Sequence, residues 1–210
     1  GNRKISKPKP KLYTYVYKNI EVIMNRTIGN HDCKAVIFDI DGTLADINHR
    51  RHFVTGKKKD FDAFNEAMIY DTPNAPVVQL LHMCMDLDYD ILFCTGRMEQ
   101  YRETTRDFLL HKCRTQPYFY PVPEAWDNDL VNNEPKLVRY MEKALDHVLF
   151  MRPDHQRYFN DWEVKERMLT DIQATRDKDN ILFAVDDRQR VVDMWREKGI
   201  TCLQCADGNF

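Results

Sequence analysis

Short apolar runs alternate along this chain with longer stretches whose apolar residues recur at helical spacing. The runs expected to form strands are Ala35–Phe38, Ile91–Cys94, Val148–Met151, Ile181–Val185 and Ile200–Cys205. The stretches between them are expected to be amphipathic helices, because residues such as Val77, Leu81 and Cys84 share one helical face. This alternation of strand and helix predicts an α/β fold with a mainly parallel, five-stranded sheet.

Several helix boundaries can be predicted from single residues. Asn74 followed by Pro76 predicts a helix start, and Gly199 predicts the end of a helix that begins at Arg188. Another helix is expected to begin near Asp161. Further helices are expected from the spacing of Phe61, Phe64, Ala67 and Met68, of Tyr101, Thr105, Phe108 and Leu109, and of Leu137, Tyr140, Met141 and Ala144.

The pattern also divides the chain. Residues 1–33 begin with a basic, proline-containing stretch and are expected to form an arm or a β-hairpin. Residues 34–210 are expected to form one domain. Within it, residues 45–73 are predicted to be a small cap-like insertion. Residues 114–133 interrupt the alternation with three prolines and are predicted to be a surface insertion.

Composition limits the kinds of protein this can be. The 210 residues are 43% hydrophobic and 30% charged, with a net charge of −2, so the chain has enough apolar residues for a core and is not a polycation. No apolar run reaches membrane-spanning length, and no signal-peptide core is seen at the N-terminus. Cys84 and Cys94 lie in apolar segments, which favours reduced thiols and a cytoplasmic location. Cys202 and Cys205 are spaced as in zinc sites, but no second ligand pair follows them, so a strand is favoured.

Polar residues follow four of the five predicted strands. They are Asp39 and Asp41, Thr95 to Arg97, Arg152, and Asp186 and Asp187. Because ligands bind at the carboxyl ends of parallel strands, these side chains are expected to meet in one crevice. Converging carboxylates repel one another unless a cation lies between them, and oxygen ligands suit Mg²⁺. The Thr95 hydroxyl and the Lys165 ammonium suit a phosphate group, so the crevice is predicted to catalyse phosphoryl transfer.

The order of these residues resembles a known superfamily. Asp39-x-Asp41-Gly42-Thr43, then Thr95-Gly96-Arg97, Lys165 and Asp186-Asp187 resemble the four motifs of haloacid dehalogenase (HAD) phosphohydrolases. Segments 164–166, 184–188, 191–196 and 202–210 are similar to the 3′-phosphatase domain of bacteriophage polynucleotide kinase. The resemblance implies a Rossmannoid three-layer sandwich with at most a small cap. The Gly-x-x-x-x-Gly-Lys-Ser/Thr loop of the kinase half is not found, so no 5′-kinase activity is expected.

The resemblance also implies roles for individual residues. Asp39 would attack phosphorus and form an aspartyl-phosphate, and Asp41 would protonate the leaving alcohol and then activate water. Mg²⁺ would be held by Asp39, the backbone carbonyl of Asp41, Asp186 and Asp187. Phosphate would be bound by Thr95, Gly96, Arg97 and Lys165, with Lys165 also offsetting the charge of Asp39.

The implied activity is removal of a 3′-phosphate from the ends of DNA or RNA. A kinase or ligase on another chain is an expected partner. A phage-encoded protein that acts in the host cytoplasm is one expected origin. Arg152 and Arg157 are candidate nucleic-acid contacts, although solvated loop residues are the ordinary alternative. Arg97 has the alternative of a capping or ion-pairing residue near its strand end. His49 and His52 are interpreted as loop residues.

Two other functions are compatible with the sequence. One is a nucleotidase or other small-molecule phosphatase in which residues 46–72 and 114–133 act as a lid. The other is a catalytically silent nucleic-acid-binding module. An intact acidic cluster argues against the silent module, because uncompensated carboxylates would repel phosphate.

Overall fold

A computed structural model describes residues 34–55, 57–87, 89–114 and 145–208. A parallel sheet of five strands lies at its centre, in the order β5-β4-β1-β6-β7. The strands are β1 (Ala35–Phe38), β4 (Asp90–Met98), β5 (Leu149–Arg152), β6 (Ile181–Asp186) and β7 (Cys202–Gln204). The predicted α/β class and parallel five-stranded sheet are therefore confirmed.

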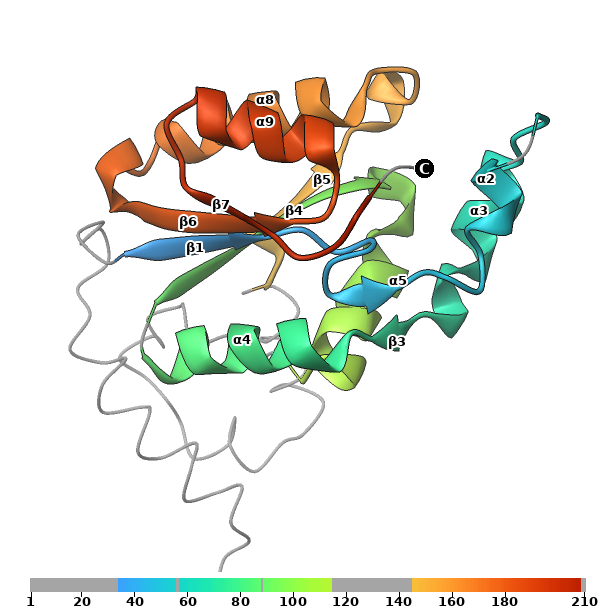
Figure 1. The fold of residues 1–210 in the computed structure, drawn as a ribbon, viewed down its shortest axis with the longest axis horizontal. Helices are drawn as coiled ribbons and strands as arrows, with labels where there is room; N and C mark the ends of the chain where they lie inside the picture. Colours follow the sequence, from blue (N-terminus) through green and yellow to red (C-terminus); the bar gives the residue numbers. More distant parts are fainter. Residues whose placement is uncertain (1–33, 56, 88, 115–144, 209–210) are drawn as a thin grey trace, which may run out of the picture.

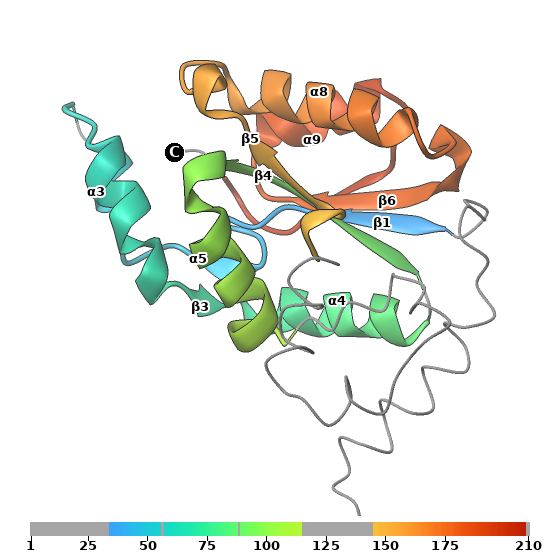
Figure 2. The same ribbon diagram turned by 180° about the vertical axis from the view of Figure 1, so that it is seen from behind.

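Helices cover both faces of the sheet (Figures 1 and 2). Helices α4 (Ala75–Asp86) and α5 (Arg102–Asp107) lie on one face. Helices α8 (Asp161–Gln173) and α9 (Gln189–Glu197) lie on the other, which completes the predicted three-layer sandwich. All four residues of β1 are buried, as expected for a strand covered on both faces. Among the described residues, no helix combines the length and the apolar character needed to cross a bilayer.

A small cap projects from the strand ends. It contains α2 (His52–Thr55), α3 (Phe61–Glu66) and the 3₁₀ turn Ala67–Tyr70. Two short antiparallel strands, β2 (Ala45–Asp46) and β3 (Thr72–Pro73), pair at its base and return the chain to α4. The predicted short helix is confirmed here, and Phe64 and Met68 are buried while Phe61 is exposed.

Three local features differ from the sequence predictions, although α4 begins directly after Asn74 as expected. Strand β4 continues through Thr95, Gly96 and Arg97 to Met98, because it stays paired with β5 across an irregularity in register. The side chain of Asn74 does not cap α4, since it donates instead to the carbonyl oxygen of Thr43 at 2.9 Å. The helix after β4 is built from three parts, a 3₁₀ turn (Glu99–Tyr101), α5 and a π-helical turn (Phe108–Lys112).

The remaining short elements are 3₁₀ turns at Asp154–Gln156 and Lys178–Asn180. Helix α9 ends before Gly199, which has a φ of 77° that favours glycine. The arm or hairpin predicted for residues 1–33, the body of the insertion predicted for 114–133 and the helix predicted over 137–144 lie outside the described residues.

The strand order places a topological switch point at β1. The chain leaves β1 towards β4 on one side, and the later strand β6 pairs with β1 on the other. Ligands of open α/β sheets bind beyond the carboxyl end of the strand where the order reverses. That end of β1 carries Asp39 and Asp41.

Candidate active site

Asp39 lies in a buried cluster that joins β1, β6 and α8, which we call the acidic cluster (Asp39, Lys165, Asp186 and Asp187). The Lys165 Nζ donates to Asp39 Oδ1 at 2.6 Å and to Asp186 Oδ2 at 2.8 Å. Lys165 reaches this position because it lies on the face of α8 that packs on the sheet beside Val164, Met168 and Leu169. Its side chain is 1% exposed, so the ammonium exchanges its hydration for these carboxylates.

Three carboxylates of the acidic cluster converge on one point. Each of Asp39, Asp186 and Asp187 offers an oxygen within 4.8 Å of the others. Asp187 Oδ1 is buried and has no hydrogen-bond partner in the described part of the chain. Gly42 and Gly208 leave the space beside Asp187, because a Cβ atom on either would lie 2.3 or 2.5 Å from Asp187 Oδ2. An oxygen-only donor set with one unpaired oxygen fits a hard divalent cation such as Mg²⁺.

The protonation equilibria of the acidic cluster reflect its crowding. Burial raises the pKa of Asp39 well above its usual value; Lys165 opposes this rise, and Asp186 and Asp187 add to it. Burial and the Asp186 carboxylate raise the pKa of Asp187 to about 7. Burial lowers the pKa of Lys165, but Asp186 and Asp39 outweigh this effect and keep the amine charged. With all three carboxylates ionised, the cluster would carry more negative charge than its ammonium neutralises, and a bound cation would favour that ionised state.

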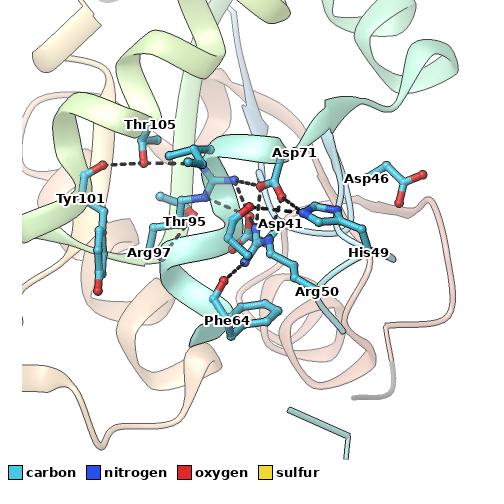
Figure 3. A network of polar contacts seen from close by, with 12 residues as sticks. Asp41, Asp46, His49, Arg50, Phe64, Asp71, Thr95, Arg97, Tyr101 and Thr105 are labelled. Atoms are coloured by element: carbon cyan, nitrogen blue, oxygen red, sulfur yellow. Dashed lines mark hydrogen bonds and ion pairs between the residues drawn. The ribbon is translucent and has the colours of Figure 1, made fainter. Parts of the chain in front are cut away.

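Asp41 belongs to a different group of charges, which we call the arginine cluster (Asp41, Arg50, Asp71 and Arg97) and which Figure 3 shows. Arg50 binds Asp71 through two nitrogens at 2.7 and 2.6 Å and reaches Asp41 at 2.7 Å. Arg97 donates to Asp41 Oδ1 at 2.9 and 2.6 Å and to Asp71 Oδ2 at 2.6 Å. The Arg50 guanidinium also lies 4.2 Å from the centre of the Phe64 ring. Two guanidinium groups thus neutralise two carboxylates.

The arginine cluster controls the charge of Asp41. Burial raises the pKa of Asp41, but the ion pairs with Arg97 and Arg50 outweigh burial and hold this pKa well below its usual range. The side chain of Asp41 points towards these arginines and does not belong to the acidic cluster. Its predicted metal contact, through the backbone carbonyl, stays a prediction.

Arg50 and Asp71 were not singled out from the sequence. No spacing rule marks them, because they lie on either side of the cap helices, 21 residues apart. The antiparallel pairing of β2 with β3 brings the two ends of the cap together. The available signal was a charged pair flanking a predicted amphipathic helix, which many exposed segments also have.

Two residues of the predicted phosphate-binding triplet, Gly96 and Arg97, line the cavity that also contains Asp39 and Asp41, whereas Thr95 does not. Thr95 is fully buried, and its Oγ1 accepts from the backbone nitrogen of Arg97 at 3.2 Å. Gly96 passes so close to Asp161 that a Cβ atom would lie 2.2 Å from Asp161 Oδ1. Arg97 faces the cavity, but its guanidinium holds Asp41 and Asp71 in this structure. Binding of phosphate by Thr95, Gly96 and Arg97 stays a prediction.

Arg152 and Arg157 have different environments. Arg152 is buried and donates to the carbonyl oxygens of Gly96, Gln156 and Phe159 and to Asp161, at 2.7 to 3.0 Å. These bonds hold the loop after β5 against β4. Arg157 is exposed and pairs with Asp62 of α3 at 2.7 Å, which ties that loop to the cap. Of the two predicted nucleic-acid contacts, only Arg157 has an exposed side chain.

A cavity of about 420 Å³ connects these parts. Its core side includes Asp39, Asp41 and Arg188, and its cap side includes Lys59, Phe61 and Phe64. The volume lies within the range of small-molecule sites, roughly 300–1,000 Å³. Asp39 and Asp41 are therefore accessible to a ligand that enters between the cap and the sheet.

Comparison with known proteins agrees with this geometry. Residues 33–210 match the family described as the polynucleotide kinase PNKP phosphatase domain. A chain of the Pnkp1/Rnl/Hen1 RNA repair complex superposes with a TM-score of 0.55 and 28% identity over 85% of this chain and 44% of that chain. A chain of a second structure of the Pnkp1/Rnl/Hen1 complex gives 0.52 and 28%, over 84% of this chain and 47% of that one.

This chain thus spans less than half the length of those two chains. A class C acid phosphatase from Bacillus anthracis with tungstate bound shares the fold, with a TM-score of 0.52 and 14% identity over 95% of this chain and 78% of that chain. The match over 33–210 covers the sheet, the cap and both clusters. The chain belongs to the PNKP phosphatase domain family, of the haloacid dehalogenase type.

Proposed function

We propose that this chain is a Mg²⁺-dependent phosphomonoesterase that removes 3′-phosphates from polynucleotide ends through an aspartyl-phosphate. The observation that carries the proposal is the acidic cluster, with Asp39 facing the cavity and the remaining charge held behind it. A carboxylate nucleophile must be ionised and must point at phosphorus, and Lys165 favours the ionised form at 2.6 Å.

The first step transfers the phosphoryl group to the protein. An Asp39 oxygen forms a bond to phosphorus while the bond from phosphorus to the 3′ oxygen breaks. Lys165, fixed by Asp39 and Asp186, keeps positive charge beside the nucleophile throughout. The transferred phosphate would rest against Gly96 and Arg97, which line the cavity, and the proposed binding set also includes the buried Thr95.

Asp41 is assigned the proton transfer in both steps, as the acid in the first and the base in the second. In the second step a water oxygen forms a bond to phosphorus while the bond from phosphorus to the Asp39 oxygen breaks, which frees inorganic phosphate and restores the Asp39 carboxylate. An ionised Asp41 accepts the proton of this water, which suits a carboxylate with a depressed pKa. The first step needs the opposite state, a protonated Asp41. A phosphate dianion in the cavity would compete with Asp41 for Arg97, and losing this partner would raise the pKa of Asp41 towards the value needed for donation.

Mg²⁺ bound by Asp39, Asp186 and Asp187 would neutralise charge on the phosphate and on the cluster. The unpaired Asp187 Oδ1 supports this assignment. The backbone carbonyl of Asp41 remains part of the proposed ligand set.

The choice of polynucleotide ends rests on the family and on its structural neighbours. Chains of an RNA repair complex are similar to this one at 28% identity, which favours RNA ends and a kinase or ligase on another chain or segment. The cap is small, since its described helices are α2, α3 and one 3₁₀ turn, and this size favours a macromolecular end over an enclosed small molecule. A cytoplasmic location, predicted from the cysteines, stays a prediction.

Phosphate release from a matched set of substrates tests the proposal. The set contains 3′-phosphorylated RNA and DNA oligonucleotides, the same oligonucleotides with 5′-phosphates, and mononucleotides, each with Mg²⁺ or with EDTA. We expect Mg²⁺-dependent release from the 3′-phosphorylated oligonucleotides. Preference for mononucleotides would instead favour the nucleotidase, and no release from any substrate would favour a silent binding module.

A further inference from the structure

Three aromatic side chains stand exposed at the mouth of the cavity that contains Asp39. They are Tyr158 (92% exposed), Phe61 (53%) and Phe159 (39%), and all three line the cavity. Phe61 begins α3 on the cap, whereas Tyr158 and Phe159 lie in the loop after β5, so the rings flank the entrance from two elements. We call these three residues the aromatic rim. A soluble domain normally buries such rings, and a group of them at a cavity mouth indicates a binding surface.

Positive charge accompanies each part of the aromatic rim. The Lys59 Nζ lies 5.9 Å from the centre of the Phe61 ring, and the Arg167 guanidinium lies 4.6 Å from the centre of the Phe159 ring. Arg157, next to Tyr158, also lines the cavity. Two carboxylates beside the rim already have partners, since Asp62 pairs with Arg157 and Asp60 accepts from the backbone nitrogen of Ala63.

Alternating aromatic and basic groups match the chemistry of a single nucleic-acid strand, in which flat bases alternate with charged phosphates. We propose that the aromatic rim binds the unpaired nucleotides next to the scissile phosphate by stacking, so that the substrate is a single-stranded 3′ end of at least two nucleotides. The inference rests on the proposed phosphatase function and specifies its substrate class.

Geometry favours an unpaired strand over a duplex. Every base has a flat face that can stack on an aromatic ring, whatever its sequence, but in a duplex the neighbouring bases cover those faces. The scissile phosphate must reach Asp39 inside the cavity, and the nucleotides attached to it must then pass between Phe61 on the cap and Tyr158 on the opposite loop. The Arg157–Asp62 ion pair links these two sides.

Truncation of the rim separates this inference from a general loss of activity. The measured quantity is the ratio of kcat/KM for a 3′-phosphorylated trinucleotide to kcat/KM for glycerol phosphate, which carries no base. We expect Tyr158→Ala and Phe61→Ala each to lower this ratio about tenfold, the scale of losing one stacked base, and Tyr158→Phe to keep it. Tyr70→Ala is the matched control, because Tyr70 is 69% exposed on the cap and does not line the cavity.

Binding gives a second readout that needs no turnover. The Asp39→Asn variant should bind a fluorescent 3′-phosphorylated trinucleotide, and adding Tyr158→Ala should weaken the dissociation constant about tenfold. Replacing the terminal bases of the trinucleotide by abasic residues should remove the effect of Tyr158→Ala.

The outcomes distinguish the two proposals. Ratios unchanged in both Tyr158→Ala and Phe61→Ala, or a blunt 3′-phosphorylated duplex hydrolysed as fast as the single strand, would overturn the stacking inference alone. Hydrolysis of glycerol phosphate without hydrolysis of any 3′-phosphorylated oligonucleotide would overturn the proposed function itself.

Discussion

The two buried clusters at the end of β1 differ in charge balance. In the acidic cluster three carboxylates face the single ammonium of Lys165, and Asp187 Oδ1 has no hydrogen-bond partner in the described ranges. In the arginine cluster two carboxylates face two guanidinium groups. Apart from Asp41, whose side chain is 19% exposed, the side chains of both clusters are buried, so an imbalance of charge in either is costly.

This difference in charge balance suggests that the acidic cluster needs a bound cation, whereas the arginine cluster does not. The acidic cluster is incomplete without additional positive charge, which is expected of a group that binds a cation and then a phosphate. The arginine cluster is neutral by itself and joins the cap to β1 and β4. The arginine cluster fixes the position of the Asp41 side chain and keeps it ionised.

The largest expected effect comes from removing the nucleophile. Asp39→Asn keeps the size of the side chain and abolishes its nucleophilicity, so kcat should fall about 10⁴-fold or more. Phosphate release from a 3′-phosphorylated oligonucleotide measures this effect, and circular dichroism checks the fold. Asp171→Asn, an exposed change on α8, is the control and should keep full activity. Substantial turnover by Asp39→Asn would refute the nucleophile assignment.

Replacing one positively charged side chain in each cluster tests whether the two clusters differ in charge balance. Lys165→Met removes the ammonium that bonds Asp39 and Asp186, and Arg50→Met leaves Asp41 and Asp71 to share the single guanidinium of Arg97. Each change leaves buried negative charge uncompensated and should lower the free energy of unfolding by about 3–5 kcal/mol. Urea unfolding with EDTA and with Mg²⁺ measures the loss. Mg²⁺ should restore part of the stability of Lys165→Met, because it replaces the missing positive charge.

Mg²⁺ should raise the free energy of unfolding of Arg50→Met only by as much as it raises that of the unmodified chain. An equal additional recovery in both variants would show that charge balance does not distinguish the two clusters.

Cation binding to the intact chain is expected to have a smaller effect. At saturating Mg²⁺ the Tm should rise by about 5 °C, because binding to the folded state alone adds roughly 2–3 kcal/mol. Differential scanning calorimetry measures the shift. Asp186→Asn should abolish it, whereas a double change of Arg50→Met and Asp71→Leu, which removes a balanced pair, should leave it in place.

The smallest expected effect is the pH dependence contributed by Asp161, at the border of the acidic cluster. Burial raises the pKa of Asp161, but Lys165, Arg188 and Arg152 outweigh burial and lower it below 3.8. A depressed pKa contributes stability above 3.8, and this contribution is lost as the pH falls through the folded-state pKa.

Asp161→Asn should therefore lower the free energy of unfolding by about 1 kcal/mol at neutral pH, and the difference from the unmodified chain should shrink in acid. Urea unfolding over a range of acidic pH measures it, with Asp171→Asn as the control. A difference that grows in acid would contradict the assigned direction of the pKa shift.

Local sequence determined the sheet and the acidic cluster. Each buried strand is a short apolar run, and an apolar run covered on both faces is recognisable without its neighbours. Asp39, Asp186 and Asp187 follow such runs directly, so the parallel arrangement alone brings their carboxylates together. Lys165 was identified from its place in the motif order and from the helix that begins at Asp161.

Tertiary structure decided the arginine cluster and the aromatic rim. Arg50 and Asp71 meet because β2 pairs with β3, and a two-residue strand has too little sequence to be recognised. Phe61 and Tyr158 face one cavity although they are far apart in the sequence, and nothing in either segment specifies the other. The sequence by itself identified most of the residues that we propose to carry the chemistry, since strand ends are local features. The tertiary structure decided the charge of Asp41 and the surroundings of the cavity, because both depend on contacts between the cap and the sheet.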